Sequence, residues 1–455
     1  MAHLAHDPAI RADRRTTLEL GAVLPQTAEV RHGHLYVGGV DMVELAREQG
    51  TALYVMDVAQ IRQQLRAYRE ALGAANQVVY AGKAFLNKAM VKLLIAEGSW
   101  LDVSSGGELA IALAAGFDPG HIVMHGNNKT EAELTEAIQA GVGLIVADCF
   151  EELDRISRIT TERGSTQSIL LRVKPGVVAD THAFIRTGAE DSKFGFGLSG
   201  GEGGSGGAAR MAVENALALP GIHLAGLHAH IGSQIFALAS FAETIAVLAD
   251  FMGALRTSSG FTPEILDLGG GLGIAYQAAD EPATIRDLGS LLTTHLASCC
   301  GELGLPLPRL MVEPGRSVVA TAGLTLYTVG VIKKLKGLRC YVAIDGGMTD
   351  NIRTALYDAR YEATLANRAA APRDTVVTLA GKHCESGDVV ALDASLQSPE
   401  IGDIVAVFGT GAYNASMSSN YNAQVRPGVV FVEDGEARLV QRRETYADLT
   451  ARDVE

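Results

Sequence analysis

Between about residues 77 and 316, short apolar and β-branched runs alternate with longer Ala-, Leu- and Glu-rich segments. Such short runs predict buried strands, and the segments 88–97 and 239–256 have helical spacing. Eight strands separated by helices predict a TIM (β/α)8 barrel, with an open doubly wound sheet as the alternative. The expected strands are Val78–Ala84, Leu101–Ser105, Ile122–Gly126, Leu144–Asp148, Ile169–Lys174, Leu224–His230, Ile265–Gly270 and Leu310–Glu313.

After Arg316 the pattern changes to strand-like runs with little helix between them, which predicts a C-terminal mainly-β domain. We therefore expect three parts: residues 1–57, an N-terminal arm with strands that join the β domain; 58–316, the barrel; and 317–455, the β domain. Residues 1 to about 30 are expected to be a loose arm, and Gly197–Gly207 an exposed flexible loop. The expected strands outside the barrel are His34–Val37, Leu53–Val55, Leu324–Ile332, Cys340–Ile344, Asp374–Leu379, Ile404–Phe408 and Val429–Glu433.

Composition narrows the possible partners. A net charge of −14 argues against nucleic acid and against an anionic membrane surface, while a small zwitterionic substrate stays compatible. The five cysteines form no C-x-x-C pair, which favours a reducing cytoplasm over a disulfide framework or a zinc cluster. The polar N-terminus and the lack of an apolar run of about 18 residues predict a soluble protein.

Active sites in barrels lie at the carboxyl ends of the strands, so the residues there are the first candidates. The first expected strand ends at Lys83. Burial lowers the pKa of a lysine and makes it a nucleophile or a Schiff-base former. The equally weighted alternative is a lysine that extends from the rim into solvent.

Two histidines, His228 and His230, alternate along the sixth expected strand, which places both on one face. They could be metal ligands or an aromatic platform beside a planar cofactor. The commonest outcome for such a pair is one functional histidine and one hydrogen-bonded core histidine.

The seventh and eighth expected strands end in residues suited to an anionic, planar ligand. The glycines of Gly269–Gly273 let backbone N–H groups approach a phosphate closely. Glu313 and Arg316, three residues apart, could form a plain salt bridge. Alternatively, the carboxylate faces a pyridine nitrogen and the arginine binds phosphate or carboxylate.

The expected β domain holds a second set of candidates. Cys384 and Glu385 lie in a glycine-containing turn, and Tyr413 is flanked by small residues. Arg353 and Tyr357 are spaced i, i+4, as on one face of a helix. Each could equally belong to an ordinary surface loop.

Together these residues resemble the fold-type III pyridoxal-phosphate decarboxylase family, over about residues 30 to 430. The matching motifs, in order, are YAGKAF (80–85), DVSSGGEL (102–109), HGNNK (125–129), LRVKPGV (171–177), TGAEDSKFG (187–195), GLHAHIGSQ (226–234), LDLGGGLG (266–273), EPGR (313–316), DGGMTDNIR (345–353), CESGD (384–388) and GAYNASMSSNYN (411–422).

The resemblance implies a role for each candidate. Lys83 corresponds to the Schiff-base lysine, and Glu313 to the carboxylate that pairs with the pyridine nitrogen. The remaining cofactor-binding set is His230, Ser233, Gly270, Gly271, Gly315, Arg316 and Tyr413, and the substrate-binding set is Arg316, Arg353, Tyr357, Glu385 and Tyr413. Cys384 corresponds to a cysteine that reaches the active site of the neighbouring subunit, so the family implies a homodimer with shared sites.

The resemblance further implies decarboxylation of meso-2,6-diaminopimelate to L-lysine and CO2, the last step of lysine biosynthesis. Two arginines and an acid suit a substrate with a distal amine and carboxylate, whereas ornithine or lysine would leave the arginines unpaired. The alternatives are a decarboxylase of ornithine, lysine or arginine, a metal-dependent barrel hydrolase that uses His228 and His230, a non-catalytic cofactor carrier, and a racemase.

Overall fold

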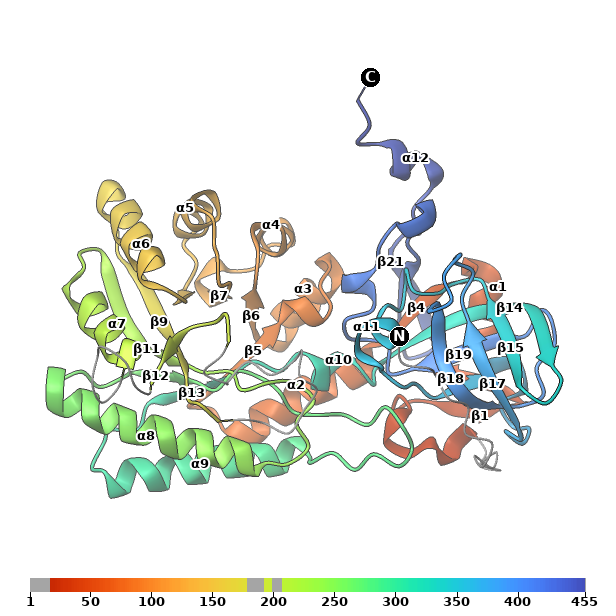
Figure 1. The fold of residues 1–455 in the computed structure, drawn as a ribbon, viewed down its shortest axis with the longest axis horizontal. Helices are drawn as coiled ribbons and strands as arrows, with labels where there is room; N and C mark the ends of the chain where they lie inside the picture. Colours follow the sequence, from red (N-terminus) through yellow and green to blue (C-terminus); the bar gives the residue numbers. More distant parts are fainter. Residues whose placement is uncertain (1–16, 178–191, 199–206, 455) are drawn as a thin grey trace. The chain divides into compact units, whose positions relative to one another are not determined.

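The computed structural model describes residues 17–177, 192–198 and 207–454 and divides into two units. The barrel unit comprises Gln63–Gly273 and Pro282–Ser317, and the β unit comprises the chain before and after it together with Ile274–Glu281. Figure 1 shows the elements of each. The domain boundaries expected at 57/58 and 316/317 stay a prediction.

The barrel unit contains a closed ring of eight parallel strands, because β8 pairs with β9 and β13 pairs with β5. The TIM barrel is thereby confirmed, and the open sheet is excluded. The strands are β5 (Gln77–Ala81), β6 (Trp100–Val103), β7 (Ile122–Met124), β8 (Leu144–Ala147), β9 (Gln167–Lys174), β11 (Ile222–His228), β12 (Ile265–Asp267) and β13 (Arg309–Val312), with the short β10 (Phe196–Gly197) beside β9.

A long α-helix lies in each connection between successive barrel strands (Figure 1). These helices are α3 (Lys88–Glu97), α4 (Gly106–Ala114), α5 (Glu131–Ala140), α6 (Phe150–Arg163), α7 (Gly207–Ala218), α8 (Ala239–Ser259) and α9 (Ile285–Glu302), and α2 (Val58–Leu72) precedes β5. Local sequence sets several of their ends. Thr130 and Glu133 form a capping box at the start of α5, and Gly141 ends it in the left-handed conformation.

Buried apolar side chains from seven of the eight strands form a core cluster in the barrel. They are Val79, Val123, Leu144, Val146, Leu170, Ala225, Ile265 and Met311, with Trp100 of β6 partly buried against them. Several strands nevertheless end earlier than the apolar pattern predicts. Lys83 lies in a 3-10 turn, η2 (Gly82–Ala84), and β11 ends at His228, so the prediction of His228 and His230 on one strand face is wrong. Hydrophobicity does not mark the end of β11, because Ala229 and Ile231 beyond it are still buried.

The β unit is built on a nine-stranded sheet in which β4 pairs with β14 and β20, so Leu53–Val55 joins it as expected. Its strands are β4 (Leu53–Asp57), β14 (Gly323–Leu335), β15 (Arg339–Ile344), β16 (Ala363–Leu365), β17 (Thr375–Ala380), β18 (Val389–Leu396), β19 (Ile404–Phe408), β20 (Gly428–Glu433) and β21 (Glu436–Gln441). The short helices outside the barrel connections are η1 (Thr17–Val23), α1 (Met42–Gln49), α10 (Arg316–Val319), α11 (Arg353–Tyr357), η5 (Ala366–Arg368), η6 (Ala415–Met417), η7 (Tyr421–Ala423) and α12 (Tyr446–Thr450). A further short helix, η3 (Pro119–His121), lies in the barrel unit just before β7.

Two predictions for the N-terminal part are wrong. The strand at His34–Val37 belongs to the β unit as expected, but the possibility that it joins the same sheet as the C-terminal strands is wrong: as β2 it pairs with β1 (Glu29–Arg31) and β3 (Val40–Asp41) in a separate three-stranded sheet. The arm is also not loose over its described part, because Leu20 and Val23 of η1 are buried in the core of the β unit. Most of the expected glycine-rich loop, 199–206, lies outside the described residues. Across the part of the chain that is described, every helix is too short or too polar to cross a membrane.

Candidate active site

Polar side chains gather at the carboxyl ends of the barrel strands, where a barrel places its chemistry. Each strand contributes one, in or just after it: Lys83, Asp102, His125, Asp148, Arg172, His228, Asp267 and Glu313. Apart from Lys83, all of these side chains are buried. Such a concentration of buried charge is costly unless its members pair or bind a ligand.

Lys83 is placed by η2 immediately after β5 and keeps 43 % of its side chain exposed. Its Nζ lies 3.6 Å from Oδ2 of Asp102, which is fully buried on β6. Burial raises the pKa of Asp102, while the positive charges of His125 and Lys83 act against that rise. The lysine is therefore an accessible amine beside a buried carboxyl group.

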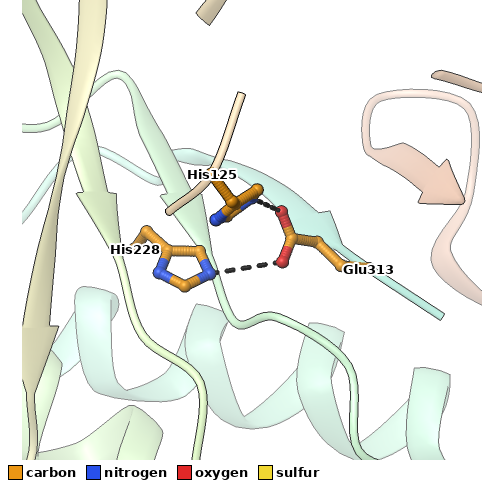
Figure 2. Close-up of side chains that lie close together, drawn as sticks. All are labelled: His125, His228 and Glu313. Carbon is orange, nitrogen blue, oxygen red and sulfur yellow. Dashed lines mark hydrogen bonds and ion pairs between the residues drawn. The ribbon is translucent and has the colours of Figure 1, made fainter. Parts of the chain in front are cut away.

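Glu313 follows β13 and joins two histidines from other strands, as Figure 2 shows. Its Oε1 lies 2.5 Å from Nε2 of His125, and its Oε2 lies 3.3 Å from Nε2 of His228. Burial alone would raise the pKa of Glu313, but the two histidines hold it well below its ordinary value. Burial lowers the pKa of both histidines. The cluster thus presents an ionised carboxylate held by two imidazole N–H groups.

A glycine turn runs closely against neighbouring backbone. A Cβ at Gly270 would lie 2.3 Å from the carbonyl oxygen of Glu313, and one at Gly271 would lie 2.6 Å from that of Gly232. A Cβ at Gly315 would lie 3.0 Å from the Cβ atoms of Ala81 and Ala84. These positions accept no side chain without movement, so backbone rather than side chains lines the turn.

Ser233 and Arg316 meet beside this turn. The Arg316 guanidinium donates to Ser233 Oγ from Nη2 at 3.0 Å and from Nε at 3.3 Å. The backbone N–H of Ile235 donates to the carbonyl of Gly271, which ties the segment after His230 to the glycine turn. A hydroxyl, a guanidinium and a bare backbone turn together suit a phosphate.

His230 is buried in the loop after β11, and its pKa is held well below the ordinary value by burial and by the nearby charges of Lys83 and Arg172. A neutral imidazole suits contact with an aromatic ring better than metal binding shared with His228, whose Nε2 is directed at Glu313.

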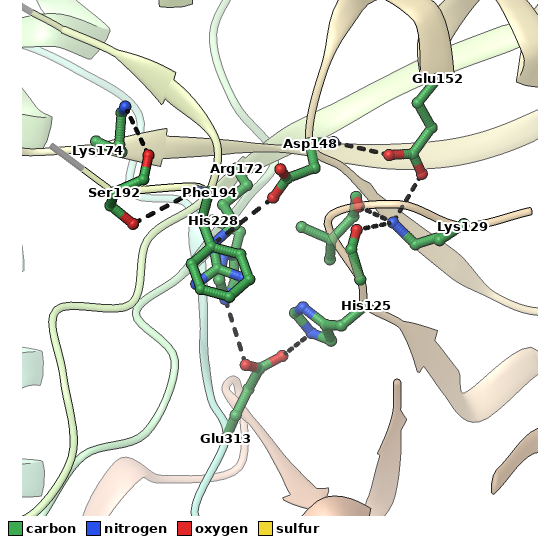
Figure 3. Close-up of polar contacts among 12 residues, drawn as sticks. His125, Lys129, Asp148, Glu152, Arg172, Lys174, Ser192, Phe194, His228 and Glu313 are labelled. Carbon is green, nitrogen blue, oxygen red and sulfur yellow. Dashed lines mark hydrogen bonds and ion pairs between the residues drawn. The ribbon is translucent and has the colours of Figure 1, made fainter. Parts of the chain in front are cut away.

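Further buried ion pairs support the strand ends (Figure 3). Lys129 donates to Glu152 at 2.7 Å and to the carbonyls of Val146 at 2.6 Å and Gly126 at 2.8 Å. Nε of Arg172 lies 4.0 Å from Oδ1 of Asp148. The Arg172 guanidinium also covers the ring of Phe194 at 4.1 Å.

In the β unit, Arg353 and Tyr357 form the two ends of α11, as their spacing predicts. Arg353 is buried and donates to the hydroxyls of Tyr276 at 2.9 Å and Tyr361 at 2.7 Å. Burial alone would lower the pKa of Arg353, but the two phenol groups raise it. Among the described residues, no carboxylate forms an ion pair with this guanidinium, so its charge remains available to an anion.

The remaining candidates of the β unit lie in turns. Cys384 is exposed, and Glu385 accepts a hydrogen bond from the hydroxyl of Tyr421. Tyr413 is half-buried and has a φ of 60°, in a turn fixed by close packing of Gly411 against the carbonyl of Val319.

The residues of the barrel unit fit pyridoxal phosphate. A primary amine, a buried carboxylate, a neutral buried histidine and a backbone turn that excludes side chains are the groups that its aldehyde, pyridine nitrogen, ring face and phosphate require. Sequence reasoning missed Asp102, His125 and Arg172 as site residues. The available signal was that each stands at or just past the end of a barrel strand.

A family model described as the pyridoxal-binding domain of pyridoxal-dependent decarboxylases matches residues 58–320. The chain is a pyridoxal-phosphate-dependent decarboxylase of the fold-type III class, a barrel joined to a mainly-β domain. Within that class it belongs to the diaminopimelate decarboxylase family.

Three relatives carry that assignment. The Bacillus subtilis diaminopimelate decarboxylase is 47% identical over 427 residues, which cover 93% of this chain and 96% of the relative. The Mycobacterium tuberculosis protein of the same name is 43% identical, over 93% of this chain and 95% of its own. A crystal structure of the M. jannaschii diaminopimelate decarboxylase in complex with L-lysine has a TM-score of 0.87 and 36% identity, covering 94% of this chain and 98% of that chain.

Proposed function

We propose that this protein decarboxylates meso-2,6-diaminopimelate to L-lysine and CO2, the last step of lysine biosynthesis, with pyridoxal phosphate as its cofactor. The observation that carries the proposal is that one closed barrel holds an exposed lysine amine, Lys83, just after β5 and the buried carboxylate of Glu313 just after β13. The names of the relatives and the lysine bound to the M. jannaschii enzyme point to the same reaction.

When bound, pyridoxal phosphate provides a ring that accepts the electron pair left as the bond between Cα and the carboxylate breaks. Lys83 would hold the cofactor through its amine, and His230 would pack on the ring face. Glu313 would face the pyridine nitrogen as a carboxylate and favour its protonated form. Ser233, Gly270, Gly271, Gly315, Arg316 and Tyr413 would bind the phosphate side.

Loss of CO2 leaves a carbanion equivalent at Cα, and one proton must replace the carboxylate. We propose that Cys384 of a second copy, or Lys83, delivers that proton. Asp102, 3.6 Å from the lysine amine, is placed to return a proton to Lys83 after each turnover.

The distal end of the substrate carries both an amine and a carboxylate. We propose that Arg353, Arg316 and Tyr357 bind the carboxylate and that Glu385 binds the amine. The available charge of Arg353 favours a substrate with a second carboxylate. Ornithine, lysine or arginine would leave that buried cation uncompensated, which typically costs a few kcal/mol.

The test has a spectroscopic and a catalytic arm. The protein purified with pyridoxal phosphate should be yellow and lose its visible band on borohydride reduction, while the Lys83→Ala variant should not carry the band. Lys88→Ala, at an exposed lysine at the start of α3, is the matched control. CO2 release should be fastest from meso-diaminopimelate in a panel with ornithine, lysine and arginine. A faster reaction with ornithine or arginine would contradict the substrate assignment, and metal-dependent activity in a colourless protein would favour the hydrolase.

We further propose a cytoplasmic homodimer with shared active sites. All five cysteines are free, as a reducing compartment requires, and Cys384 is exposed on its own chain. Mixing inactive Lys83→Ala and Cys384→Ser proteins under exchange conditions should restore about a quarter of full activity, because half the dimers become mixed and each has one intact site. No recovery in verified mixed dimers would contradict shared sites.

A further inference from the structure

The cluster around Glu313 is assembled from strands that are not neighbours in the barrel. His125 follows β7, His228 ends β11 and Glu313 follows β13. Neither β7 nor β11 is hydrogen-bonded to β13. The contacts therefore span the interior of the barrel and depend on its closure (Figure 2).

Each oxygen of the Glu313 carboxylate contacts a different histidine. His125 reaches Oε1 at 2.5 Å and His228 reaches Oε2 at 3.3 Å, both through Nε2. All three side chains are at most 7% exposed. The three donor atoms also have the spacing of a metal site, but the direct hydrogen bonds already join them. Nε2–H donation would leave Nδ1 of His228 as an acceptor, and that buried atom has no hydrogen-bond partner among the described residues.

Two other buried carboxyls interact with this cluster and make the choice of ionised group important. Burial raises the pKa of Asp267 well above its ordinary value, and the charge of Glu313 raises it further. Burial also raises the pKa of Asp102, and the charge of Glu313 adds to that rise, while the charges of His125 and Lys83 oppose it. The other charged or titratable groups that act on the cluster are Lys83, Arg172 and His230. Of the three carboxyls, Glu313 is the one with two imidazole donors, so it takes the negative charge.

We propose that His125 and His228 are positioning residues that keep Glu313 ionised and hold both of its oxygens in place for the pyridine nitrogen of the cofactor. This proposal rests on the proposed pairing of Glu313 with that nitrogen. The histidines act through Glu313 and need not touch cofactor or substrate. The role depends on their N–H donors, so a neutral amide N–H at the same place should substitute for each imidazole.

Two matched double variants test this role in the full-length protein. His125→Leu with His228→Leu removes both N–H donors, whereas His125→Gln with His228→Gln keeps an amide N–H the same number of bonds from Cβ as the imidazole Nε2. Glu313→Gln is the reference that removes the carboxylate. Circular dichroism and thermal melting establish that each variant is folded before it is compared.

The first readout is infrared difference spectroscopy of the cofactor-free protein near pH 7. The band of a protonated carboxyl that depends on Glu313 should be absent from the parent and the Gln variant and present in the Leu variant. The second readout is the Kd for pyridoxal phosphate from absorbance titration. It should rise about tenfold to a hundredfold in the Leu variant, since a charge-assisted hydrogen bond is lost, and recover most of its affinity in the Gln variant.

Two outcomes would overturn the proposal: a Leu variant whose Glu313 stays ionised with unchanged cofactor affinity, or Leu and Gln variants that are equally impaired. Failure of the proposed reaction is separable from both. A parent protein that binds the cofactor but releases no CO2 from meso-diaminopimelate would refute the substrate assignment and leave the infrared result interpretable.

Discussion

The buried pair of Lys129 and Glu152 offers a direct test of how the barrel supports its polar strand ends. Both side chains are only 2% exposed and lie 2.7 Å apart. The second oxygen of Glu152 accepts the backbone N–H of Asp148 at 3.1 Å, and Lys129 also holds the carbonyl of Gly126, next to His125. The change to make is Lys129→Met, which keeps an unbranched side chain one atom shorter and removes its charge.

Coulomb attraction at this separation is about 6 kcal/mol for an effective dielectric of 20, and the desolvation of two ions offsets most of it. Removing one partner leaves the carboxylate of Glu152 buried with its desolvation cost uncompensated. We therefore expect Lys129→Met to lower the free energy of unfolding by about 3–5 kcal/mol. Adding Glu152→Gln removes the stranded charge and keeps an acceptor for Asp148, so the double variant should lie within about 2 kcal/mol of the parent.

Urea denaturation followed by tryptophan fluorescence measures this loss in the barrel unit, because the single tryptophan, Trp100, lies on β6. The control is the second variant, which is more stable than Lys129→Met only if the uncompensated charge is the cause. A loss below about 1 kcal/mol in Lys129→Met, or no recovery on adding Glu152→Gln, would refute the reasoning.

Three further predictions concern the β unit and the reaction. Tyr276→Phe combined with Tyr361→Phe should raise KM for meso-diaminopimelate about tenfold or more, because Arg353 loses both hydroxyl acceptors; an unchanged KM would contradict this. Burial raises the pKa of Asp350 to about 6, so its folded form binds a proton more tightly than the unfolded chain and stability falls as pH rises from about 4 to 6. In urea titrations, Asp350→Asn should reduce the change in the free energy of unfolding between pH 4 and 6 by about 2–3 kcal/mol. The same pH dependence in the variant and the parent would contradict this prediction. Cys384→Ser should slow CO2 release about a hundredfold or more while the cofactor absorbance persists, as expected for loss of a proton donor; near-normal turnover would exclude that role.

The barrel could be predicted from sequence because its strands are buried on both faces and therefore read as apolar runs. The same property hides where the strands end, since Ala229 and Ile231 remain buried beyond β11. In the β unit two of the missed strands lack that signal, whereas β18 was missed although it begins with the apolar run 389–392. β16 has three residues, and β21 is almost entirely exposed, so neither carries an apolar run of useful length.

The candidate site residues likewise differ in whether local sequence or only the tertiary fold reveals them. Lys83 and Glu313 could be proposed from sequence because a charged residue that ends an apolar run is visible locally, and Arg353 with Tyr357 because a helix sets their spacing. His125 could not be found in this way, since its importance arises when barrel closure places it 2.5 Å from a carboxylate 188 residues away. Tyr276 and Tyr361 likewise could not be found from local pattern, because the fold of the β unit brings them to Arg353 from outside α11. Local pattern thus suggests the groups that we propose carry the chemistry, and the tertiary fold brings in the partners that set their charge. Variants that remove a hydrogen-bond donor without changing the charge of the site, or the reverse, are therefore the informative ones.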